Sequence, residues 1–442
     1  MKAFKKISHS AIELAALAAV LYVLIPIVYG QIMLAQQVGN KPSSTADAPS
    51  EFDALTSGMH YYMDGFLKHA GLPNRGGPAH KLYDDPSDIV ELELIYTHYP
   101  PGPNWLTGLA ITVFGPKQVP LYRLFPISFS VIGLLVTYAL LRRVVGAILA
   151  AAAVVMVLQF PMMPGMMHGL FYHPYAVTLV VVQMSFLFNR LETKSRLSGR
   201  SLCLLAGMSF FQGWLSFDWA FVAMLFPLAV VSCWRDSTTR WQMYRAVSVS
   251  VFGFALAHSL HFCQVWAIAP SFDRAFEDLF GAAKFRMNGE GPKLVPENAT
   301  IMILHKYIMT LFPSPSQATF FSWLMPSMGV GLALIVGAMG RCICGYSGKP
   351  KLITPALISM AMGFVISLVW FMVMKNHALE QGHWLFLPRH FILFLFSCVL
   401  VSVFELHAFA RLVRSRSAGL SFLSLSKSRG TCDHNDEALH TS

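Results

Sequence analysis

Runs of about 20 apolar residues recur along the chain, and each is long enough to cross the hydrocarbon core of a bilayer. Only 13% of the 442 residues are charged and 55% are apolar, whereas soluble domains carry about 25% charged residues. A soluble, disordered or nucleic-acid-binding protein is therefore excluded. The sequence predicts an all-α polytopic membrane protein with about ten transmembrane helices, near residues 11–34, 120–141, 144–160, 174–189, 201–216, 218–233, 246–268, 320–340, 353–374 and 388–410.

The basic residues indicate the orientation of these spans. Lys and Arg gather in alternate short loops, as cytoplasmic turns of membrane proteins do, which also accounts for the formal charge of +10. Both termini are predicted to be cytoplasmic. Residues 1–411 are expected to form one integral membrane domain, and the polar residues 412–442 a disordered cytoplasmic tail. The apolar stretch 103–115 is too short to cross and is expected to be re-entrant or interfacial.

Two outer loops, about 35–119 and 269–319, are long enough to carry function. In the first, apolar residues of 54–70 recur in steps of three and four, which predicts an amphipathic helix on the membrane surface. Ser50 and Asp53 resemble a capping box at its start, and Gly71 would end it. Asp53 is then either a helix cap or a general base facing a membrane-proximal cleft.

Other polar residues near the predicted outer surface each allow two interpretations. His98 is either a structural interfacial histidine or a ligand for an anionic headgroup. His168, Tyr172 and His173 are interfacial anchors or line an acceptor cleft. The charged segment 273–286 is a solvated amphipathic helix or a lid over a lipid phosphate. For His258, His261 and Gln264, which share one face of the seventh span, we expect hydrogen bonds between helices.

Several motifs in this order resemble a known family. Asp53 opens the surface helix, His98-Tyr99-Pro100-Pro101 leads into Trp105-Leu106, Phe114-Gly115 and Arg123-Leu124 follow, and Leu387-Pro388-Arg389 precedes the last span. The pattern is similar to that of the GT-C membrane glycosyltransferases, in particular the dolichyl-phosphate-mannose protein mannosyltransferases and the lipid A aminoarabinose transferases. Two departures stand out: Glu51 precedes Asp53 where the family has a following Glu, and Tyr99 splits the His-Pro-Pro. Glu51, Asp64 and Asp84 are therefore rivals of Asp53.

The resemblance implies a GT-C-like fold and transfer of a sugar from a polyprenyl-phosphate donor to a lipid, glycan or protein acceptor at the outer face. It implies Asp53 or Glu51 as the catalytic carboxylate. The residues expected to bind the donor phosphate or substrate are His98, Tyr99, Arg123, Arg389, Tyr172 and His173. No cofactor is indicated, metal dependence is left open, and the expected location is a bacterial inner membrane. The alternatives are a transporter or flippase, which predicts ionisable residues at mid-membrane, and a non-catalytic protein of the same fold.

Overall fold

The computed structural model describes residues 2–40, 42, 48–76, 94–159, 163, 166–193, 197–219, 237–288, 296–311, 352–380 and 388–429. All regular elements of this part of the chain are helical, as the sequence predicts. They are α1 (Lys2–Val38), α2 (Ala48–Asp64), η1 (Lys68–Gly71), α4 (Gly102–Phe114), α5 (Val119–Tyr122), α6 (Leu124–Val145), α7 (Ala147–Leu158), α9 (Tyr172–Thr193), α10 (Gly199–Leu215), η3 (Phe217–Trp219), α12 (Ser237–Ile268), α13 (Phe272–Asn288), α14 (Ala299–Leu311), α16 (Ile353–Val373), α17 (Lys375–Glu380) and α18 (Pro388–Arg429).

The described residues include six helices long and apolar enough to cross a membrane, so the protein is a multi-pass membrane protein. They are Ser10–Val38, Val119–Val145, Tyr172–Thr193, Tyr244–Ile268, Ile353–Val373 and Ile392–Arg414. The predicted spans 144–160 and 201–216 are the shorter helices α7 and α10, of 12 and 17 residues. Of the other two predicted spans, residues 220–233 and all of 320–340 lie outside the described residues.

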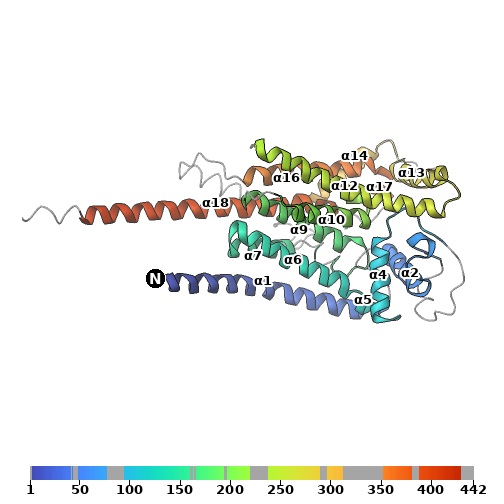
Figure 1. The fold of residues 1–442 in the computed structure, drawn as a ribbon, viewed down its shortest axis with the longest axis horizontal. Coiled ribbons are helices and arrows are strands. Elements are labelled where there is room, and N and C mark those ends of the chain that lie inside the picture. The colour runs from blue at the N-terminus through green and yellow to red at the C-terminus, as the bar shows by residue number, and fades with distance from the viewer. Residues whose placement is uncertain are drawn as a thin grey trace, which may run out of the picture.

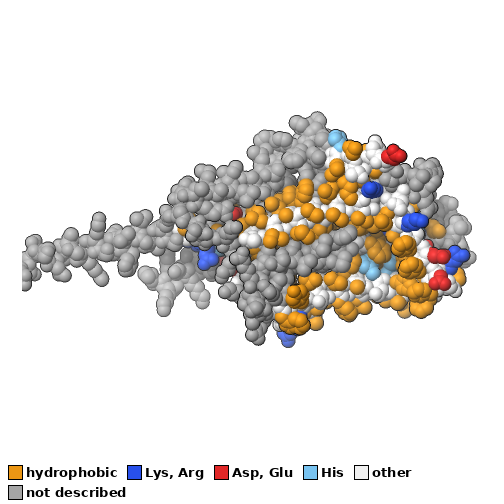
Figure 2. All heavy atoms as spheres, turned by 90° about the horizontal axis from the view of Figure 1, so that it is seen from above, with side chains coloured by type: hydrophobic (Ala, Val, Ile, Leu, Met, Phe, Trp, Pro, Cys, Tyr) orange, Lys and Arg blue, Asp and Glu red, His pale blue; other side chains and the backbone are white. Residues whose placement is uncertain are grey.

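The long helices form one bundle, and its two ends differ (Figure 1). The N-terminus of α1 and the C-terminal part of α18 extend from one end, and α2, α4 and α13 lie at the other. Charged side chains gather toward one end of the face in Figure 2, while apolar side chains run along the described part of the flank. The segments of both predicted outer loops therefore share one end. Helix α18 continues to Arg429, past the predicted domain boundary at residue 411.

Helix pairs α10–α12, α6–α9 and α16–α18 make the main contacts within the bundle. Small residues allow the backbones to approach closely, as is typical between membrane helices. A side chain at Gly253 of α12 would overlap the carbonyl of Ala206 on α10. Buried polar groups add hydrogen bonds between helices: Asn189 Nδ2 of α9 donates to the Leu140 carbonyl of α6 at 3.0 Å. These contacts fix the bundle that supports the end with α2, α4 and α13.

The amphipathic helix of the first outer loop differs from its prediction in position and in partner. Helix α2 begins at Ala48, so Ser50 and Asp53 lie inside its first two turns and the capping-box prediction is wrong. Its apolar side chains Leu55 and Met59 are buried in a cluster with Ile111 of α4. This part of the face packs on protein instead of on lipid, because the segment predicted to be re-entrant or interfacial forms a helix that covers it.

Candidate functional site

Asp53 faces a cation that the sequence analysis did not single out. Arg75 Nη1 lies 2.9 Å from Asp53 Oδ2, and the two side chains are 21% and 29% exposed. The Arg75 guanidinium also lies 3.2 Å from the centroid of the Tyr96 ring, a cation–π contact. The carboxylate is thus partly open to solvent and oriented by a cation. No spacing in the sequence marks Arg75, because its partners are 22 residues before it and 21 after it along the chain.

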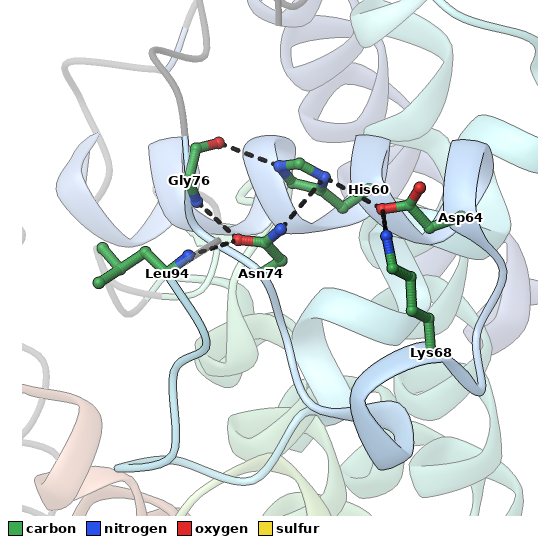
Figure 3. Close-up of polar contacts among 6 residues, drawn as sticks. All are labelled: His60, Asp64, Lys68, Asn74, Gly76 and Leu94. Atoms are coloured by element: carbon green, nitrogen blue, oxygen red, sulfur yellow. Dashed lines mark hydrogen bonds and ion pairs between the residues drawn. The ribbon is translucent and has the colours of Figure 1, made fainter. Parts of the chain in front are cut away.

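A short antiparallel pairing brings Arg75 and Tyr96 together. Asn74 and Ile95 form an isolated β-bridge. The Arg75 N–H donates to the Leu94 carbonyl and the Tyr96 N–H to the Pro73 carbonyl, both at 2.8 Å. The side chain of Asn74 strengthens this pairing, because its Oδ1 accepts from the N–H groups of Gly76 (2.9 Å) and Leu94 (3.0 Å). Figure 3 shows Asn74 between these two segments and beside His60 of α2.

The rival carboxylate Asp64 pairs with residues other than Arg75. Asp64 Oδ2 lies 3.3 Å from Lys68 Nζ and 3.4 Å from His60 Nδ1 (Figure 3). His60 Nε2 lies 3.0 Å from the Gly76 carbonyl, so this network supports the same pairing from the other side. The third rival, Asp84, lies outside the described residues.

Glu51 and Arg123 bind each other in the protein interior. Arg123 Nη1 and Nη2 donate to Glu51 Oε1 and Oε2 at 2.8 and 3.0 Å, and both side chains are fully buried. Glu51 Oε1 also accepts from the Leu170 N–H at 3.0 Å, and Arg123 donates to the His168 carbonyl at 3.0 Å. The bidentate pair therefore joins α2, the start of α6 and the segment before α9. Its geometry favours a structural role for both residues.

A cavity of about 580 Å³ lies where the first outer loop meets α13. Tyr96, His98 and Tyr99 of the loop line it together with Asp278 and Arg286 of α13, and the remaining lining residues are Glu277, Gly281, Ala282, Phe285 and Asn376. His98 Nε2 lies 3.4 Å from Asp278 Oδ1. The Arg286 guanidinium lies 4.2 Å from the centroid of the Tyr99 ring. His98 and Tyr99 therefore meet the charged segment of the second outer loop, and Arg286 adds a cation that the resemblance did not assign.

The predicted aromatic residues after the third span adjoin this cavity through Tyr99. The rings of Tyr99 and Tyr172 stack with centroids 6.5 Å apart. Tyr172 contacts His173 edge to face at 4.0 Å, and His173 itself is buried. Arg389 lies in the first turn of α18, and its side chain is outside the described residues. The structure thus brings His98, Tyr99 and Tyr172 together.

Two side chains of helix α12 donate hydrogen bonds to backbone carbonyls of the first outer loop. His261 Nε2 donates to the Thr97 carbonyl at 2.8 Å, and Gln264 Nε2 donates to the Ala70 carbonyl at 2.8 Å. Hydrogen bonds to other helices are predicted for these side chains; the partner of Gln264 lies in η1, whereas the partner of His261 lies in the segment between η1 and α4. Next to Ala70, the Gly71 carbonyl accepts from Tyr61 Oη and Trp105 Nε1, each at 2.8 Å. Burial raises the pKa of Tyr61, so its phenol stays a donor.

In the described part of the chain, no three His, Cys, Asp or Glu residues form a group that could hold a metal ion. The polar groups that lie at the end of the bundle with α2, α4 and α13 include three carboxylates (Asp53, Glu277 and Asp278), two arginines, a histidine and several tyrosines. Such a set can accept a proton, stabilise an anion and pack against a sugar or lipid.

No protein-family model and no curated protein matches the chain. Among solved structures, the crystal structure of ArnT from Cupriavidus metallidurans in the apo state matches with 14% identity and a TM-score of 0.42, covering 88% of this chain and 77% of that one. The structure of the same protein bound to undecaprenyl phosphate matches with 14% identity and a TM-score of 0.39, covering 88% and 78%. ArnT is a lipid A aminoarabinose transferase.

Proposed function

We propose that this protein is a membrane glycosyltransferase that moves a sugar from a polyprenyl-phosphate donor to an acceptor at the outer membrane face. The observation that supports this most is the continuity between Asp53 and the cavity. Asp53 pairs with Arg75, Arg75 lies on Tyr96, and Tyr96 lines the cavity with His98 and Arg286. A base, cations and an aromatic wall therefore lie along one path at the end of the bundle where a lipid phosphate would be presented.

In this proposal Asp53 is the general base. Its carboxylate accepts the proton of the acceptor hydroxyl as that oxygen attacks the anomeric carbon. The bond between the anomeric carbon and the phosphate oxygen breaks, and its electron pair leaves with the polyprenyl phosphate. One displacement of this kind inverts the anomeric centre. Arg75 orients the carboxylate through the 2.9 Å ion pair.

Arg286 and His98 are proposed to receive the donor phosphate. Both line the cavity, and charge-assisted hydrogen bonds from such groups stabilise the charge that develops on the leaving oxygen. Asp278, which pairs with His98, orients the imidazole. Tyr99 and Tyr172 supply stacked rings beside this position, where a sugar ring can pack. The acceptor is a lipid, a glycan or a protein.

The test is release of polyprenyl phosphate from a panel of radiolabelled lipid-linked sugars by the purified protein, with membrane extract as the acceptor source. Asp53→Asn is expected to lower the rate by about 10²–10⁴. Asp64→Asn is the matched control, since Asp64 lies on the same helix but its carboxylate pairs with Lys68. This variant is expected to retain activity. Activity that survives in Asp53→Asn would overturn the base. No release from any donor by the wild type would overturn the enzyme class and favour the transporter or non-catalytic alternatives.

A further inference from the structure

Helix α13 has an exposed aromatic stripe on the side away from its cavity-lining residues. Phe272, Phe276 and Phe280 recur every four residues, which places them along one side of the helix. They are 50%, 53% and 62% exposed. The rings of Phe276 and Phe280 stack with centroids 5.7 Å apart. An apolar stripe of this size on a helix calls for a partner.

The stripe continues the apolar surface of a membrane span. The C-terminal turns of the candidate span on α12 expose Leu260 (44%) and Trp266 (50%). Exposed apolar side chains on such a span can face lipid. The Trp266 ring meets the Phe272 ring edge to face at 5.5 Å. Helices α12 and α13 also pack together through Val265 and Ala275. The contact between Trp266 and Phe272 therefore connects the exposed apolar side chains of α12 with the aromatic side of α13.

We propose that α13 is seated in the outer leaflet of the bilayer through Phe272, Phe276 and Phe280. Interfacial helices bury their apolar side about 5–10 Å into the boundary between headgroups and acyl chains. Asp278 and Arg286 on the same helix line the cavity. Seating the helix in the bilayer therefore holds this wall of the cavity at the depth of the headgroup phosphates. This inference goes beyond the proposed function and does not depend on sugar transfer.

The charges of α13 define the kind of lipid surface. The helix has three acidic and three basic residues, which are Asp273, Arg274, Glu277, Asp278, Lys284 and Arg286. Equal numbers of opposite charges give no net attraction to anionic headgroups, unlike the basic helices that bind them. The aromatic side chains therefore account for the seating, and it is expected to be independent of anionic lipid.

The experiment uses the full-length protein in nanodiscs of phosphatidylcholine that contain a phosphatidylcholine with a photoactivatable diazirine in its acyl chain. After irradiation and digestion, mass spectrometry is expected to find lipid adducts on the α13 peptide as well as on the peptide around Trp266. Mixing phosphatidylglycerol into the discs is expected to leave the α13 yield unchanged. The triple variant Phe272→Ser/Phe276→Ser/Phe280→Ser is expected to lower the α13 yield about tenfold, with adducts at Trp266 retained.

Asp273→Asn is the matched control, because it changes an exposed polar residue of the same helix and is expected to keep the wild-type yield. Wild-type discs with adducts near Trp266 and none on α13 would overturn the inference. A yield that rises severalfold with phosphatidylglycerol would show electrostatic docking and contradict apolar seating.

Discussion

Arg75 Nη1 lies 2.9 Å from Asp53 Oδ2, and the same guanidinium lies 3.2 Å from the centre of the Tyr96 ring. One arginine therefore connects the proposed base to the cavity wall. The backbone pairing of 73–76 with 94–96 fixes this contact. The orientation of the carboxylate therefore depends on residues 73–76 and 94–96, which lie outside the helices predicted from the sequence.

Arg75 is expected to be needed for turnover. Arg75→Gln removes the charge and the planar group that orient Asp53, and we expect kcat for polyprenyl phosphate release to fall by about 10- to 100-fold. Arg75→Lys keeps the charge but loses the fork and the ring stacking, so an intermediate kcat is expected. Lys68→Gln, which breaks the exposed pair with Asp64, serves as control. A wild-type kcat in Arg75→Gln would contradict this role.

Arg286 is expected to contribute to binding of the donor phosphate. Arg286→Gln removes a charged hydrogen-bond donor from the cavity, and we expect polyprenyl phosphate to bind about tenfold more weakly in an equilibrium assay. The control is Arg274→Gln on the same helix, whose side chain is 74% exposed and pairs with Glu277 at the surface. Equal loss in both variants would point to general charge attraction instead of a defined site.

The Glu51–Arg123 pair is expected to stabilise the fold. Glu51→Gln leaves the buried Arg123 guanidinium without its charge partner, which costs about 3–5 kcal/mol. Thermal unfolding in detergent should therefore begin at a clearly lower temperature. The double variant Glu51→Leu/Arg123→Met removes both charges and is expected to recover most of the loss. If the double variant unfolds at the temperature of Glu51→Gln or below it, the loss comes from something other than an uncompensated charge.

His168 is expected to make stability depend on pH. Burial, reinforced by the nearby Arg123 guanidinium, lowers the pKa of His168 to about 4 from 6.5. The neutral ring donates from Nδ1 to Gln31 Oε1 at 2.6 Å. Between pH 6.5 and 4, His168 is therefore mostly protonated in the unfolded chain and mostly neutral in the folded protein. Stability due to this group is therefore full above pH 6.5 and falls with decreasing pH, by at most about 1.4 kcal/mol per pH unit.

Melting temperatures measured across this pH range would check the His168 prediction. His168→Gln removes the titrating group and is expected to flatten the decline. The variant would also unfold at a lower temperature at neutral pH if its amide fails to replace the hydrogen bond to Gln31. A decline of the same slope in wild type and variant would assign the pH dependence to other groups.

Much of the architecture follows from the sequence, because a bilayer restricts spanning segments to long apolar helices. The helices α1, α6, α9, α12, α16 and α18 all lie where spans were predicted. The predicted site residues His98, Tyr99 and Tyr172 come together, and Asp53 pairs with Arg75, which contacts the cavity-lining Tyr96. The buried ion pair of Glu51 and Arg123 is not predictable in the same way, since a sequence does not show that two charges 72 residues apart face each other.

The sequence by itself determined that the chain is a helical membrane protein with acidic and aromatic residues outside its spans, because composition and periodicity reflect the solvent around each segment. Tertiary structure decided which partner each amphipathic helix meets. Leu55 and Met59 of α2 are covered by α4, whereas Phe276 and Phe280 of α13 stay exposed. The same periodicity suits a protein core and a lipid surface, since both remove apolar side chains from water. Only packing between distant segments distinguishes them, and the same packing places Arg75 beside Asp53 and Arg286 beside Tyr99.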